Sequence, residues 1–282
     1  MYKTLKKLFI FTLICIFFPF SACATAGPSQ PQTTPQTPPN PPQKQEPQSQ
    51  NPPVKNPDGI WDVTDVDVSE ILKDRKLISF TFDDAPKRSL EGILAVFAAF
   101  NEQNPHFRAS ATLFCNGILI DESTLPLLQT AWTMQFELGN HTHTHLDLTT
   151  LPANDLRREI NQTDKLLSQT DNKPLHLLRA PYGKLNECVR AAAQTPIIDW
   201  TIDTNDWTGR SADAIYDTVM QNKTDGSIVL MHDGYPHTIS ALKRLLPDLM
   251  HAGYQVVSVS KMAKAHQCNL QNGSVYIRAR KR

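Results

Sequence analysis

From about Asp58 onward, short apolar runs alternate with stretches whose apolar positions recur at helical spacing. The short runs predict buried strands at Leu77–Phe82, Ala111–Cys115, Phe136–Gly139, Leu175–Arg179, Ile197–Trp200, Ser227–Met231 and Gln255–Val259. The periodic stretches predict helices at Leu90–Asn101, Leu125–Met134, Asp155–Gln169, Glu187–Gln194, Ala212–Gln221 and Thr238–His251. This alternation predicts an α/β domain with a parallel sheet, open or closed into a barrel.

Polar side chains of reactive types follow directly after the predicted strands. They are Asp83-Asp84, His141, Arg179, Asp203 and His232. In α/β barrels the loops that leave the carboxyl ends of the strands converge on one face, and that face carries the active site. The pattern therefore predicts one polar site built from several strand ends.

The first 26 residues have the features of an export signal. A lysine-rich start precedes the apolar run Leu8–Phe20, which is too short to cross a bilayer comfortably as a helix. Phe20–Cys23 resembles a bacterial lipobox, although the usual pattern has leucine where Phe20 stands, and Ala24–Ala26 offers an ordinary cleavage site instead. We favour lipidation at Cys23. The expected location is the bacterial cell envelope, on its periplasmic or extracellular face.

Residues 27–57 contain about half of the chain's 21 prolines, together with glutamine, threonine and serine. Such a composition cannot bury enough apolar surface to fold, so we expect a disordered linker between a membrane anchor and a folded domain. The domain itself is expected over residues 58–268. Residues 269–282 end in several arginines and a lysine and are interpreted as a solvated basic tail.

Overall charge and cysteine content exclude some kinds of site. The 28 Lys+Arg residues balance the 28 Asp+Glu residues, so no basic surface for nucleic acid is expected. Nothing in the sequence implies a protein partner. Cys115, Cys188 and Cys268 form no CxxC pair, which argues against a thiolate zinc site. We expect them to be buried thiols.

Asp83-Asp84 and the segment Gly139–His145 (GNHTHTH) indicate a metal site. Two adjacent carboxylates at the end of a buried strand need cationic compensation, which a metal and an arginine would supply. In a strand all three histidines would share a face, whereas a helical or turn-like segment would pair His141 with His145 and leave His143 aside. We favour the second arrangement. Two imidazoles and one aspartate would leave coordination positions on zinc for water and substrate.

Five short segments resemble, in order, the motifs of the NodB-homology polysaccharide deacetylases, carbohydrate esterase family 4. The segments are TFDD (Thr81–Asp84), HTHTH (His141–His145), RAPYG (Arg179–Gly183), DTNDW (Asp203–Trp207) and LMH (Leu230–His232). The first motif departs from the family because Ala85 stands where glycine is usual. If the backbone needed positive φ there, alanine would cost about 1 kcal/mol, but the following proline favours an extended Ala85.

The resemblance extends over Leu77–Met262 and implies a distorted (β/α)7 barrel that removes N-acetyl or O-acetyl groups from a polysaccharide, an amide hydrolase in the first case and not a peptidase. It implies a divalent metal, Zn²⁺ first and Co²⁺ or Ni²⁺ as alternatives. The roles it implies are Asp84, His141 and His145 as metal ligands, Asp83 as general base, His232 as general acid, Arg179 orienting Asp83, Asp206 tuning His232, the Tyr182 backbone N–H holding the oxyanion, Pro181 shaping that loop, and Trp207 and Leu230 walling the acetyl pocket.

Two other classes of function share part of this pattern. A tethered glycan-binding protein with a vestigial metal site would bind polysaccharide without releasing acetate, but it would not need Asp83 and His232. A non-haem iron oxygenase shares the two-His, one-carboxylate ligand set, but no cosubstrate site is evident. The remaining histidines fit no motif and are interpreted as structural or exposed: His106, His176, His237, His251 and His266.

Overall fold

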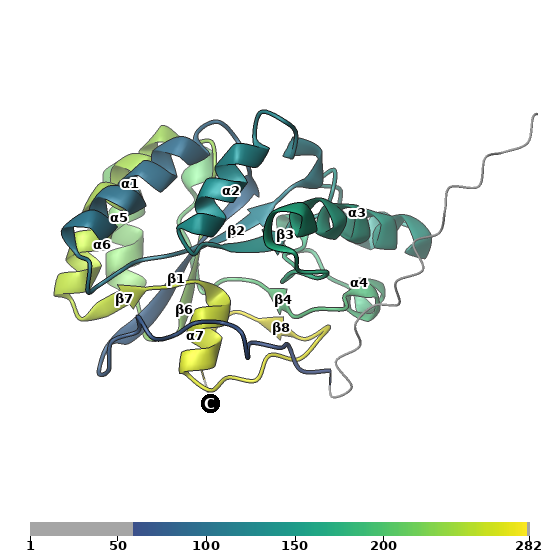
Figure 1. Ribbon diagram of the computed structural model, residues 1–282. Coiled ribbons are helices and arrows are strands. Elements are labelled where there is room, and N and C mark those ends of the chain that lie inside the picture. Colours follow the sequence, from purple (N-terminus) through teal and green to yellow (C-terminus); the bar gives the residue numbers. More distant parts are fainter. Residues whose placement is uncertain (1–58, 281–282) are drawn as a thin grey trace, which may run out of the picture. The chain divides into compact units, whose positions relative to one another are not determined.

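The computed structural model of the protein describes residues 59–280 (Figure 1). The expected export signal, the lipidation site Cys23 and the linker therefore lie outside the described residues. Within residues 59–280, no helix combines the length and the apolarity that a bilayer-spanning helix needs. These residues form the α/β domain that the alternating pattern predicts.

The central strand is β1 (Lys76–Ala85), and it is buried along almost its whole length. It pairs in parallel with β2 (Thr112–Cys115), with β6 (Ser227–His232) and, at its start, with β7 (Tyr254–Val256). Strands that are covered on both faces in this way are expected to read as continuous apolar runs. In β1 the apolar residues of LISFTF are interrupted by Ser79 and Thr81, but both of these are fully buried as well.

The remaining strands lead around a distorted ring and back to β1, with β4 and β5 connected through the chain. β2 pairs with β3 (Glu137–Asn140), and Leu178 bridges β3 to β4 (Ile197–Ile198). After a short bend the chain forms β5 (Ile202–Asp203), which pairs with β6 beside β1. The fold is thus a distorted parallel barrel, as expected. The strand predicted at Leu175–Arg179 is reduced to one residue, Leu178, which forms isolated bridges to Asn140 and Ile197.

Helices surround the strands, and their boundaries follow local signals. They are α1 (Leu90–Gln103), α2 (Leu125–Thr133), α3 (Ala153–Asp171), α4 (Glu187–Ala192), α5 (Ala212–Asn222), α6 (Pro236–His251) and α7 (Val259–Ala265). Ser211 caps α5 by accepting a hydrogen bond from the Ala214 backbone, and proline stands at the start of α6. In Figure 1, α1, α5 and α6 lie together, and α1 and α5 both contact α6. Their apolar faces form the main core with β1 and β6.

The segment after residue 268 is part of the domain. Leu270 and Ala279 are buried, and the strand β8 (Val275–Tyr276) pairs with β4. The described part of residues 269–282 therefore packs against the domain through Leu270 and Ala279, beyond the expected boundary at residue 268, whereas Arg278 and Arg280 are exposed as expected.

The cysteines differ from expectation in one respect. All three cysteines of the described part are free, and Cys115 is buried as expected. Cys188 is exposed, however, and Cys268 is only partly buried. Cys188 lies in the first turn of the short helix α4, whose inward face is supplied by Val189 instead.

Candidate active site

Asp84, His141 and His145 bring their ligand atoms within 4.8 Å of one another, and among the described residues this is the group that could hold a metal ion. His145 Nε2 lies 3.5 Å and His141 Nε2 3.9 Å from the same Asp84 oxygen, Oδ1. His141 Nδ1 donates to the Arg179 carbonyl oxygen at 2.8 Å, which leaves Nε2 as the nitrogen that could bind a metal ion. Burial lowers the pKa of His141 and so favours its neutral, ligating form.

The loop that carries the histidines is neither strand nor helix. β3 ends at Asn140, and both Thr142 and His145 adopt left-handed backbone conformations with φ of 69° and 60°. His141 and His145 therefore meet through a turn, while His143 lies outside the cluster. The His143 ring packs against Gly117, where an added Cβ would come within 2.4 Å of its Nδ1.

Asp84 also has a left-handed backbone, with φ of 60°. Non-glycine residues in this region are strained and tend to gather at functional sites, and aspartate and histidine tolerate it better than most. Ala85 is an ordinary buried residue of β1. The alanine in place of the usual glycine therefore causes no left-handed strain.

Asp83 is bound by a buried arginine, Arg179, which directly follows the bridge residue Leu178. Arg179 Nη1 donates to Asp83 Oδ1 at 2.7 Å and to the Thr81 hydroxyl at 2.7 Å. The guanidinium is fully buried, and its Nε donates to the Ile198 carbonyl oxygen at 2.9 Å. Asp83 Oδ2 lies 3.6 Å from His141 Nε2 and so borders the group of candidate metal ligands. This arrangement resolves the repulsion between the adjacent carboxylates of Asp83 and Asp84.

His232 is oriented by Asp206, which is fully buried. His232 Nδ1 donates to Asp206 Oδ1 at 2.8 Å, and the His232 backbone N–H donates to Oδ2 at 2.8 Å. The Thr238 hydroxyl also donates to Oδ2, at 2.6 Å. Burial acts to lower the pKa of His232, but the bond to Asp206 and the charge of Asp83 outweigh it, so the pKa is raised. The imidazole therefore holds a proton more readily than an ordinary histidine.

The residues expected to shape the substrate pocket differ in exposure. Pro181 is buried and Tyr182, which is 63% exposed, has a φ of 61°. The Tyr182 ring lies 4.8 Å from the His145 ring. Trp207 is 54% exposed, whereas Leu230 is buried within β6. Tyr182 thus packs against His145, one of the candidate metal ligands, while much of its side chain is exposed to solvent.

Lys87 belongs to the site but was missed from the sequence. Its Nζ lies 3.3 Å from Asp84 Oδ2, the oxygen that does not face the histidines. Burial acts to raise the pKa of Asp84, but Lys87 and the two histidines outweigh it, so the pKa is lowered. Asp233 holds the Lys87 loop by accepting from the Lys87 backbone and the Ser89 hydroxyl, both at 2.6 Å.

Helix α3 supports the histidine loop with acidic side chains that sequence reasoning also missed. Glu159 accepts hydrogen bonds from the backbone and hydroxyl of Thr144 at 2.7 and 2.8 Å. Asp164 accepts from the Asn140 side chain at 2.9 Å. Both carboxylates lie among the buried residues of α3 at helical spacing. Acidic residues on the apolar face of a helix were the available signal.

Asp164 also contacts His176, which lies between two buried carboxylates. Its Nδ1 lies 2.9 Å from Asp164 and its Nε2 lies 3.2 Å from Asp171. Burial acts to lower the pKa of His176, but the bonds to Asp164 and Asp171 outweigh it and raise the pKa to about 9. His176 is therefore a buried cation. The interpretation as a structural histidine agrees with this position.

Comparisons with known proteins agree with the motif order. Residues 72–196 match the family model described as polysaccharide deacetylase. The chain is 30% identical over 203 residues to a peptidoglycan-N-acetylglucosamine deacetylase of Bacillus cereus, covering 69% of this chain and 92% of that protein. It is 32% identical over 192 residues to the peptidoglycan-N-acetylglucosamine deacetylase PgdA of Listeria monocytogenes, covering 67% of this chain and 39% of the relative.

A solved structure gives the same result at the level of the fold. The Xyl-CE4 domain of a multidomain xylanase from the hindgut metagenome of Trinervitermes trinervoides superposes with a TM-score of 0.67 at 27% identity, covering 73% of this chain and 98% of that domain. The chain spans only 31% to 39% of the length of some curated relatives that it matches. Fold, motif order and sequence similarity agree, and the chain belongs to the polysaccharide deacetylase family, carbohydrate esterase family 4.

Proposed function

We propose that the protein is a metal-dependent hydrolase that removes acetyl groups from the N-acetylated sugars of a polysaccharide. The observation that supports this most directly is the placement of two proton-handling groups, Asp83 and His232, beside one candidate metal cluster. Relatives from Bacillus cereus and Sinorhizobium fredii are named as peptidoglycan-N-acetylglucosamine and chitooligosaccharide deacetylases.

The proposed cofactor is a divalent metal held by Asp84, His141 and His145. The donor set fits a borderline cation, because it offers one carboxylate oxygen and two imidazole nitrogens. Zn²⁺ is the first candidate, with Co²⁺ and Ni²⁺ as alternatives. When bound, such a cation polarises a carbonyl oxygen and lowers the pKa of a water molecule.

Asp83 is proposed as the general base. Its Oδ1 is committed to Arg179, and its Oδ2 faces the cluster, so one oxygen is positioned while the other can accept a proton. The attacking water gives that proton to Oδ2 as its oxygen adds to the acyl carbon of the substrate. Arg179 keeps the carboxylate in place during this step.

His232 is proposed as the general acid. Its Nδ1–H is committed to Asp206, so Nε2 is the nitrogen that can donate a proton to the departing amine. The carbon–nitrogen bond breaks, acetate leaves and the sugar keeps the amine. The raised pKa of His232 favours the protonated form that this step requires.

The pocket residues have proposed roles in the same reaction. The Tyr182 backbone N–H would stabilise the oxyanion, and Pro181 would fix the loop that presents it. Trp207 and Leu230 would wall the acetyl group. The nearness of the Tyr182 and His145 rings supports this assignment, because it brings the 181–183 turn to the metal cluster.

An acetate-release assay tests the function against its alternatives. Purified protein is incubated with a panel of acetylated oligosaccharides and polysaccharides, with and without a chelator, and free acetate is measured. We expect acetate release that the chelator abolishes and added metal restores. Glycan binding without acetate release would favour the tethered binding protein with a vestigial site, and oxygen consumption would favour the oxygenase.

We further propose that the enzyme acts at the bacterial cell envelope, anchored by a lipid on Cys23. Peptidoglycan or an exported poly-N-acetylglucosamine would then be the accessible substrate. The export-type segment, the lipobox-like Phe20–Cys23 and the proline-rich linker support this location. Radiolabelled palmitate should enter the full-length protein but not its Cys23→Ala variant. Equal labelling of the two proteins would refute the anchor.

A further inference from the structure

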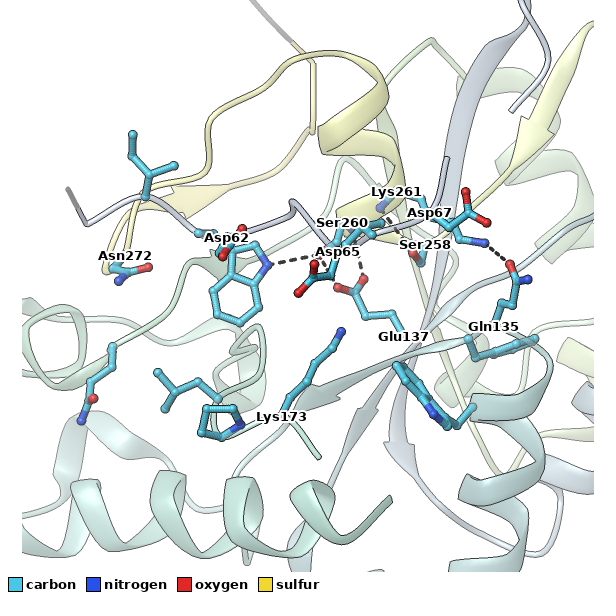
Figure 2. Close-up of a pocket in the computed structure, with 18 residues that line it drawn as sticks. Asp62, Asp65, Asp67, Gln135, Glu137, Lys173, Ser258, Ser260, Lys261 and Asn272 are labelled. Atoms are coloured by element: carbon cyan, nitrogen blue, oxygen red, sulfur yellow. Dashed lines mark hydrogen bonds between the residues drawn. The ribbon is translucent and has the colours of Figure 1, made fainter. Parts of the chain in front are cut away.

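A cavity of about 740 Å³ lies apart from the candidate active site, and none of its lining residues belongs to that site (Figure 2). It opens at the start of β3, beside Glu137, whereas the histidine loop follows the end of that strand. Its volume falls within the usual range for a small-molecule site. Residues that define its walls include Trp61, Asp65, Trp132, Glu137, Lys173 and Asn272.

Two indole rings give the cavity flat apolar walls. Trp61 is fixed because its Nε1 donates to the Ser260 hydroxyl at 3.2 Å. Trp132, at the end of α2, is 36% exposed. Rigid aromatic faces combined with polar groups at the edges form the type of surface that fits the apolar face of a sugar ring and its hydroxyl groups.

The polar part of the wall is predominantly acidic. Four carboxylates line the cavity, from Asp62, Asp65, Asp67 and Glu137, against the two ammonium groups of Lys173 and Lys261. Lys261 is already engaged, because it donates to the Gln135 side chain at 2.6 Å. Glu137 is engaged as well, because it accepts from the Thr112 hydroxyl at 2.8 Å and from the Ser260 backbone at 3.1 Å. The free carboxylates of the wall are therefore the three aspartates.

Two of the acidic groups are exposed aspartates, which are ionised at neutral pH, and hydrogen bonds from neighbouring residues hold them in place. Bonds from Thr64 lower the pKa of Asp62, and bonds from Ser69 lower the pKa of Asp67. The lining residues thus carry more negative than positive charge, although Lys264, which does not line the cavity, offsets part of the charge of Asp62 and Asp67.

Lys173 indicates which kind of group the wall accepts. Its Nζ lies 5.2 Å from the centre of the Trp132 ring, and Figure 2 shows its side chain extending into the cavity. An ammonium group over an indole face is stabilised by the ring quadrupole. Asn272 also lines the cavity, and its buried Oδ1 has no hydrogen-bond partner in the described structure.

We propose that this cavity binds amino sugars that carry a free ammonium group, in particular deacetylated stretches of the polysaccharide. The proposal rests on the proposed function, because deacetylation converts a neutral acetamide into an amine that is protonated near neutral pH. The indole faces would contact the sugar rings, and the acidic rim would contact the ammonium groups. A product-binding site would keep the enzyme on a chain that it has begun to deacetylate.

The test measures binding without turnover. The full-length Asp83→Asn protein is titrated calorimetrically with a glucosamine oligosaccharide and with its fully N-acetylated counterpart. The glucosamine oligomer should bind more tightly, and its affinity should fall with added salt. Trp132→Ala should weaken this binding by roughly tenfold, and Asp65→Asn should weaken it less. Asp217→Asn, which makes the same charge change on the exposed surface of α5, should have no effect.

A gain of affinity provides a test that misfolding cannot imitate. Lys173→Met removes the ammonium group that occupies the face of the Trp132 ring, where an ammonium group of the ligand would otherwise bind. This change should therefore strengthen binding of the glucosamine oligomer. Equal affinity for both oligomers, or unchanged binding in Trp132→Ala and Asp65→Asn, would overturn the proposal. Because no turnover is needed, failure of the deacetylase assay and failure of this binding test are separate results.

Discussion

The candidate active site and the distal cavity both gather acidic and aromatic side chains, but they are built differently. In the candidate active site the two groups proposed for proton transfer each have a dedicated partner from another element, in the pairs Asp83–Arg179 and His232–Asp206. In the cavity the carboxylates of Asp62 and Asp67 lie on an exposed segment and are held only by neighbours two residues away. A fixed partner orients a side chain for proton transfer. The exposed carboxylates of Asp62 and Asp67 instead contribute only negative charge to the cavity wall.

This difference predicts how each region responds to substitution. Loss of one partner in the active site leaves a buried charge without compensation, which is costly. Loss of one rim carboxylate removes a single solvated charge and changes little in the folded protein. The following substitutions test the comparison, from the largest expected effect to the smallest.

The candidate metal ligands should be the most sensitive positions. Asp84→Ala and His141→Ala should lose bound metal, measured by elemental analysis of the purified protein, and acetate release should fall to background. His143→Ala changes a histidine in the same loop but outside the cluster, so it should keep its metal. Metal retained in the first two variants would contradict the proposed ligand set.

Asp83→Asn and His232→Ala should keep the metal and lose turnover. Removal of a general acid or base typically costs roughly 10²–10⁴-fold in rate. The rate constant for acetate release, measured together with metal content, separates this effect from loss of the cofactor. Rates near that of the wild type in either variant would refute the proposed proton-transfer role.

Arg179→Met should destabilise the fold, because it leaves the Asp83 carboxylate buried without its cation. Breaking a buried pair in this way costs about 3–5 kcal/mol. Urea unfolding would measure the change in the free energy of unfolding. Adding Asp83→Asn to Arg179→Met should recover part of the loss, since the second change removes the unpaired charge. Simple additivity of the two changes would argue against the coupling.

His176→Gln should reduce stability in a pH-dependent manner. The folded-state pKa of about 9 lies above the ordinary value of 6.5, so the stabilisation is fully present below pH 6.5 and is lost as the pH rises through 9. The wild type should therefore exceed the variant by on the order of 3 kcal/mol near pH 6, and the difference should shrink by pH 10. A constant difference across this range would show that His176 does not act through its charge.

Trp132→Ala should have the smallest effect on catalysis. The ring is partly exposed and lies outside the active site, so acetate release from a short acetylated oligosaccharide should stay within about a factor of two of the wild-type rate. Initial rates at saturating substrate provide the measurement. A large loss of rate on this short substrate would mean that the two regions are not independent.

The sequence predicted the long elements and the strand-end residues, because each left a strong local signal. The run LISFTF marks β1, and Asp84, one of the polar residues that follow it, belongs to the candidate metal site. The two-residue strands β5 and β8 have no periodicity of their own, since their pairing is decided by neighbours distant in the chain. Lys87 and Glu159 were missed for a similar reason: their partners Asp84 and Thr144 are set by loop geometry that no motif records.

The left-handed backbone at Asp84 and His145 restricts which substitutions can preserve the metal cluster. Aspartate, asparagine and histidine enter this conformation more readily than most side chains, so the two positions combine a ligand requirement with a conformational one. Glutamate at position 84 would keep the charge, yet it would lengthen the side chain and adopt the backbone less readily. An engineer who wants a different metal preference should therefore begin with the supporting residues Lys87 and Glu159 and leave the ligands in place.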